Sequence, residues 1–261
     1  MQNIDPLFIL QPVIIIIICT ALLLYWYRKR HFHWMVLVYS LVAYSVAIAL
    51  KYAVQIPTIN AVTSYFGSAS VGLGVYYGLQ TVIFEVGLAY AVAWYIISHG
   101  LLEHKDAEAY GSGLAFWENA GLLGILSLIS LIATYSILQS NTPLAQTVYN
   151  QLKTSQPGLF APAREALSSV ALGTLERISS IIFHFAWGYL CMMAAIFHKK
   201  RLFIIALPMG FVDFLVPFAS TMGIVTFEAA VFALSALSLF VTWFAIRQLA
   251  AKDSDRTFTS S

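Results

Sequence analysis

Seven ionisable side chains lie within long apolar stretches of this chain, where charged groups are rare. They are Glu85, Glu118, Glu176, Arg177, His184, Asp213 and Glu228. A charged group at the centre of a lipid-embedded helix costs roughly 2.5–3.5 kcal/mol on insertion scales. We therefore expect these side chains to face one another or a hydrated cavity, and so to form an internal polar cluster.

Three kinds of chemistry are open to such a cluster. A metal site would combine His184 with two or three carboxylates and a second histidine, but the only other candidate is His198, at the edge of an apolar stretch. General acid–base chemistry could pair Glu118 or Glu176 with His184, and carboxylates in series could relay protons or ions. The alternative without chemistry is a buried salt-bridge network that fixes the geometry of a helix bundle.

Helical spacing suggests how the charges pair. Arg177 and His184 are seven residues apart and lie on nearly one helix face, whereas Glu176 and Arg177 are separated by about 100° around the helix. Arg177 therefore needs a carboxylate from another span, and Glu85 or Asp213 is the expected partner. We predict a structural ion-pair group of Arg177, Glu176 and Asp213.

The composition predicts the elements that position these residues. The 261-residue chain is 60% hydrophobic and 10% charged, with a mean hydropathy of +0.79, whereas soluble domains are about 25% charged. We predict a single membrane domain over 1–261, an all-α bundle of seven spans of roughly 20 residues or more. These spans are Leu7–Tyr27, Trp34–Val54, Ser70–Ser98, Gly113–Leu138, Ala163–Phe197, Leu202–Ala219 and Gly223–Ala245.

Basic residues predict the orientation of the bundle. They follow the first span at 28–30 and the fifth at 199–201, while Lys51 is assigned to the opposite side with few other cations. By the positive-inside rule the N-terminus is outside and the C-terminus is cytoplasmic, as expected for a protein of the plasma or cytoplasmic membrane. The connection 139–162 is an outer loop with a short amphipathic helix. No basic tract suits nucleic acid.

The ionisable residues lie in short motifs that resemble those of a known family. Phe84-Glu85, Trp117-Glu118, Glu176-Arg177 with a histidine seven residues after the arginine, and Val212-Asp213 occur in the order seen in YhfC-type intramembrane metalloproteases, members of the CAAX-protease and PrsW-like superfamily. The resemblance covers roughly 84–218, which it marks as a protease-like four-helix core. It implies a centre in which glutamate acts on water and histidines contribute to a metal or catalytic site.

Four positions depart from the family's motifs. Val86 stands where a second glutamate is expected, Ala89 where an arginine is, and Leu114 and Met209 where histidines are. Leucine cannot ligate a metal, and the methionine thioether is a poor ligand for zinc-like ions. We therefore predict a catalytically degenerate relative without a metal or cofactor.

The expected role is a membrane scaffold or accessory subunit. Its partners would be the lipid bilayer and other membrane subunits, as for the non-catalytic Aph subunit of γ-secretase, which resembles members of the same superfamily. One alternative is an active intramembrane peptidase, in which Glu85, Glu118, Glu176 and His184 are catalytic and zinc is possible at His184. The other is a small transporter or ion/proton-relay subunit.

Overall fold

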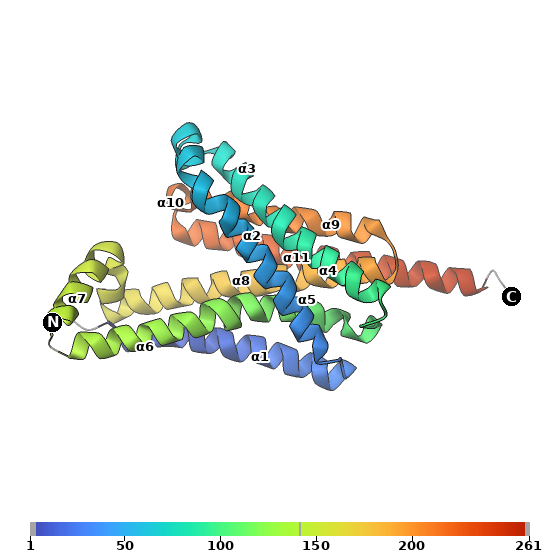
Figure 1. Cartoon of the computed structure of the whole chain (residues 1–261), viewed down its shortest axis with the longest axis horizontal. Coiled ribbons are helices and arrows are strands. Elements are labelled where there is room, and N and C mark those ends of the chain that lie inside the picture. Colours follow the sequence, from blue (N-terminus) through green and yellow to red (C-terminus); the bar gives the residue numbers. More distant parts are fainter. Residues whose placement is uncertain (1–3, 141, 259–261) are drawn as a thin grey trace.

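A computed structural model describes residues 4–140 and 142–258, and these residues form a helical bundle without strands (Figure 1). Seven of its helices are long and apolar enough to cross a membrane, so the predicted fold class is confirmed. In chain order the elements are η1 Pro6–Ile9, α1 Leu10–Arg30, α2 Met35–Phe66, α3 Val71–Gln80, η2 Thr81–Val86, α4 Gly87–Ser98, η3 His104–Asp106, α5 Ala107–Phe116, η4 Trp117–Gly124, α6 Ile125–Gln139, α7 Pro143–Ser155, η5 Pro157–Phe160, α8 Ala163–Ile196, α9 Lys200–Gly210, η6 Phe211–Phe218, α10 Ala219–Met222 and α11 Ile224–Phe258.

Helix α2 extends well beyond the predicted end of the second span at Val54. It continues through Pro57, which removes a backbone donor. Such prolines are tolerated in membrane helices where Ser or Thr side chains bond nearby carbonyls, and the Thr58 hydroxyl donates to the Val54 carbonyl oxygen at 2.6 Å. As a result Lys51 lies in the middle of a helix rather than near its end.

The fourth span likewise begins before the predicted Gly113. The turn η3 starts it at His104, and the preceding Glu103 forms a capping box with Asp106. The Asp106 carboxylate accepts a hydrogen bond from the Glu103 backbone N–H at 2.8 Å. A polar turn with this cap can begin a helix without apolar residues, which is why hydropathy alone placed the start too late.

Helix α8 is the centre of the bundle, and α1, α4, α5, α9 and α11 all pack against it (Figure 1). Its second half is buried around Trp187 and Leu190. The closest approach is to α5, where a Cβ on Gly188 would lie 2.7 Å from the Gly111 Cα. Small residues allow helix backbones in membranes to approach closely, so these two glycines set the α5–α8 distance.

Gly111→Ala should separate these helices and destabilise the protein by about 1–3 kcal/mol. The added Cβ would lie 2.5 Å from the Phe185 carbonyl oxygen and 2.9 Å from the Tyr189 nitrogen, and backbone atoms cannot rotate away. Thermal unfolding in detergent should show a lower Tm than wild type. Gly87→Ala is the matched control, since its Cβ would meet only the Val82 carbonyl oxygen at 3.6 Å.

Three spans are interrupted by segments that are not α-helical. The π-helical η2 carries Glu85, the π-helical η4 carries Glu118, and the 3₁₀ segment η6 carries Asp213. Segment η6 follows Pro208 and contains Pro217, in line with the interruption that prolines impose on helices. Because π-helical turns occur frequently at functional sites, these irregular segments point to the region around the three acidic residues.

The two ends of the bundle differ in shape. At one end the helices α2 and α3 diverge from α6 and α8, and α7 lies in the connection between these last two helices (Figure 1). Helix α7 lies within the predicted 139–162 connection, and its first turn is capped by the Thr142 hydroxyl, which accepts from the Ala145 N–H at 3.2 Å. The side chains described next come from both groups of helices, since Lys51 lies on α2 and His184 on α8.

Candidate functional site

Lys51 joins three elements through its ammonium group. The Nζ atom donates to Glu85 Oε1 at 2.6 Å, to Thr81 Oγ1 at 2.8 Å and to Asp213 Oδ2 at 3.0 Å. An ammonium has three N–H donors, so each donor has an acceptor. The Lys51 side chain is only 15% exposed, and it therefore ties α2 to η2 and η6 inside the bundle.

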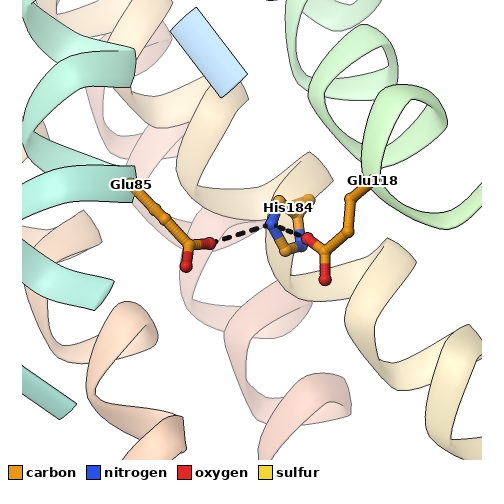
Figure 2. Close-up of side chains that lie close together, drawn as sticks. All are labelled: Glu85, Glu118 and His184. Carbon is orange, nitrogen blue, oxygen red and sulfur yellow. Dashed lines mark hydrogen bonds and ion pairs between the residues drawn. The ribbon is translucent and has the colours of Figure 1, made fainter. Parts of the chain in front are cut away.

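His184 lies between two carboxylates that come from opposite sides (Figure 2). Its Nε2 is 3.3 Å from Glu85 Oε2 and also contacts Glu118 Oε2. Its Nδ1 is 2.9 Å from the Ser180 carbonyl oxygen, which can only accept. Both ring nitrogens therefore face oxygen atoms, and the ring protonated at both nitrogens is the form that donates a hydrogen bond to each side.

Arg177 lies on α8 about two turns from His184 and completes the set of cations. Its Nη1 is 3.8 Å from Glu118 Oε1, and its Nη2 forms an ion pair with Glu176. Glu118 is mostly buried, whereas the Glu176 side chain is 43% exposed. The guanidinium therefore shares the buried carboxylate of Glu118 with His184. It also pairs with the more exposed carboxylate of Glu176.

We use the name polar network for the six charged residues Lys51, Glu85, Glu118, Arg177, His184 and Asp213. It contains three acidic and three basic side chains, and every member has a side chain of the opposite kind within 4 Å. All six line one cavity of about 450 Å³, together with Glu176 and tyrosines 44, 52 and 77. The polar network is thus mutually paired and open to a cavity.

The structure brings together five of the predicted site residues and adds one that the sequence interpretation placed elsewhere. Glu85, Glu118, Arg177, His184 and Asp213 converge as expected, with Glu176 beside Arg177. The sequence interpretation counted Lys51, near the predicted end of the Trp34–Val54 span, among the cations of the outer side, and this is wrong because its ammonium lies inside the bundle. A lysine close to a span end normally extends its amine to the interface, and only the length of α2 shows that this one cannot.

One predicted pairing needs correction. Among the described residues Asp213 pairs with Lys51 rather than with Arg177, and the guanidinium pairs with Glu118 and Glu176. Glu228 lies apart from these ion pairs near the start of α11, where it is buried at 2% exposure, and its Oε2 has no hydrogen-bond partner among the described residues.

Comparison with known proteins identifies the family. The model of the YhfC intramembrane metalloprotease family matches residues 13–235, so this chain belongs to that family, and the predicted resemblance is confirmed. The match extends on both sides of the 84–218 core and includes Lys51. No curated protein and no solved structure matches the chain. With its seven apolar helices, the chain is an integral membrane protein.

The family name implies a metal ion. The side chains here offer enough donor atoms for one, but the charge beside them is unsuited to it. Glu85, Glu118 and His184 each offer a ligand atom within 4.8 Å of the other two, and catalytic zinc sites have three protein ligands. The charge does not fit. The Lys51 ammonium lies 2.6 Å from Glu85, so a divalent cation held by that carboxylate would meet a second positive charge at short range in a low-dielectric interior. The residues present therefore do not fit a divalent ion while Lys51 remains in place.

The four positions at which the sequence analysis expects departures from the family's motifs share one environment. Val86, Ala89, Leu114 and Met209 are all buried in the main apolar cluster of the bundle. Leu114 is 3% exposed and Met209 is 6% exposed. None is a charged or imidazole side chain, so these positions now contribute to packing around the polar network.

Proposed function

We propose that this chain is a non-catalytic member of its family that serves as a membrane scaffold or accessory subunit of a membrane complex. The observation that carries the proposal is the burial of Val86, Ala89, Leu114 and Met209 in one apolar cluster. These side chains supply no proton transfer, and none of them is a ligand suited to zinc-like ions. Restoring a reactive group there would require placing a polar side chain in a packed core, which is costly without partners.

The polar network supports this role in a second way. Its ion pairs join α2, η2, η4, α8 and η6, which belong to five of the seven spans. Mutually paired charges in a low-dielectric interior fix the relative positions of the helices that carry them. A rigid bundle of this kind is what a scaffold subunit needs, and it requires no metal or cofactor.

An apolar groove offers a place for a partner. It has a volume of about 630 Å³ and lies between α9, η6 and α11, where Pro208, Leu215 and Leu237 are among its lining residues. Within a bilayer such a surface suits a transmembrane helix or acyl chains, since packing of apolar groups drives helix association there. We propose that the partner subunit contacts this face.

The proposal includes a location and an orientation. The protein resides in the plasma or cytoplasmic membrane, with its N-terminus outside and its C-terminus cytoplasmic. The basic residues 28–30 and 199–201 support this orientation through the positive-inside rule. Helix α7 would then lie on the outer surface of the membrane.

Site-specific crosslinking of the full chain in native membranes tests the scaffold role. A photo-crosslinking residue at Leu237, which is 53% exposed in the groove, should capture one membrane protein reproducibly. The same residue at Ile17 on α1, 60% exposed, is the matched control and should not capture it. Equal labelling at both positions, or labelling by lipid alone, would contradict the presence of a dedicated partner.

The second candidate function is an intramembrane peptidase with an altered site. The contact between Glu118 and His184 favours it, because a carboxylate and an imidazole in contact can act as general base and general acid. In this case Glu85 and Glu176 would be the remaining catalytic carboxylates. Membrane-protein N-termini should then differ between cells with the wild-type chain and cells with Glu118→Gln. We expect no difference, and cleavage sites that disappear in Glu118→Gln would overturn the non-catalytic proposal.

A further inference from the structure

Lys51 occupies the position at which a cation would neutralise the carboxylates of this pocket. Its ammonium lies 2.6 Å from Glu85, and the other oxygen of the same carboxylate faces His184 Nε2 at 3.3 Å. A single carboxylate thus connects the ammonium to the atoms that form the three-donor group of Glu85, Glu118 and His184. The same ammonium also holds Asp213 at 3.0 Å.

We propose that Lys51 is a tethered cation that excludes divalent metal ions from the pocket. The inference rests on the proposed non-catalytic function and explains how the pocket retains its carboxylates without a metal. The lysine is covalently part of α2, so its effective concentration at the carboxylates does not depend on the ions in solution. Lys51 is therefore a specificity-determining residue for cation binding.

The position of the ammonium makes the effect of removing Lys51 specific. Lys51 pairs with Glu85 and Asp213, whereas Arg177 pairs with Glu118 and Glu176. Lys51→Met keeps an unbranched side chain of similar length without the charge. It therefore removes the repulsion that a divalent ion meets at Glu85, Glu118 and His184, a set of one imidazole and two carboxylates that zinc and cobalt accept.

The test is metal binding by the purified full-length chain in detergent, with Zn²⁺ and Co²⁺ as probes. Wild type should bind less than about 0.1 equivalent of zinc, whereas Lys51→Met should bind about one, with an affinity raised at least about 100-fold by the loss of the nearby charge. The cobalt-loaded variant should show visible d–d absorption. Lys51→Arg keeps the positive charge and should bind no more metal than wild type, and Lys51→Met with His184→Ala should lose the gained site.

Each other outcome has a distinct meaning. Stoichiometric zinc in wild type that is lost in Lys51→Met would overturn the inference, because Lys51 would then be a supporting partner of a metal ligand, and the non-catalytic proposal would fail with it. Folded Lys51→Met without metal would overturn the inference alone. If Lys51→Met does not accumulate, Lys51→Met with Asp213→Asn removes one charge of each sign. This folded double variant must bind more zinc than wild type, or the inference fails.

Discussion

Lys51→Met should lower the free energy of unfolding by about 3–5 kcal/mol in metal-free buffer, the range seen when one partner of a buried ion pair is removed. The change leaves Glu85 and Asp213 without their shared cation inside the bundle. Reversible unfolding in mixed micelles, with a chelator present, measures the effect. Lys153→Met is the matched control, because Lys153 is an exposed lysine on α7 and should change stability by less than about 0.5 kcal/mol.

A second substitution separates charge from packing. Asp213→Asn in the Lys51→Met background removes one of the two carboxylates that the ammonium had neutralised. The double variant should therefore be more stable than Lys51→Met alone, and the double-mutant cycle should give a coupling of the order of 1–3 kcal/mol. If the two losses simply add, Lys51 acts through the packing of its stem, and the proposed electrostatic role of the ammonium is wrong.

The seven spans could be predicted because each presents a long apolar stretch, and lipid imposes helices on such stretches. The predicted ends of the spans were less accurate. Helix α2 continued past Val54 because Thr58 bonds a carbonyl near Pro57, and the fourth span began early because Glu103 and Asp106 cap it. Both effects depend on polar side chains, which lower the mean hydropathy and so count against a membrane span.

The polar network could be predicted in its membership but not in its pairings. Glu85, Glu118, Arg177, His184 and Asp213 were found because each is costly in lipid unless it has a partner. Their directions could not be read from a period of 3.6 residues, since Glu85 and Glu118 lie in π-helical segments and Asp213 lies in a 3₁₀ segment. Each irregular turn rotates the following side chains relative to a regular helix.

Lys51 shows a different limit. The sequence around it has no feature that distinguishes a lysine directed into the bundle from one that extends to the membrane surface. Its role depends on the acceptors of two other spans, Glu85 and Asp213, which are 34 and 162 residues away along the chain. Only the packing of α2 against those spans brings the Lys51 ammonium to these two carboxylates. The proposal that Lys51 excludes divalent metal ions depends on that contact.

Arg177→Met should also lower the free energy of unfolding by about 3 kcal/mol, whereas Glu176→Gln should lower it by less than about 1 kcal/mol. The guanidinium faces the largely buried Glu118, and its loss leaves His184 as the one ion-pair partner of that carboxylate among the described residues. Glu176 is 43% exposed, so much of its charge is already stabilised by its surroundings. The same unfolding assay in mixed micelles measures both variants.

Arg164→Met supplies the control on the same helix, because Arg164 is exposed in the first turn of α8. It should leave stability within about 0.5 kcal/mol of wild type. Were Glu176→Gln as damaging as Arg177→Met, the neighbouring carboxylate rather than Glu118 would be the partner that matters. Arg177 would then contribute little to the link between α8 and η4, and His184 would be the main ion pair between those two segments.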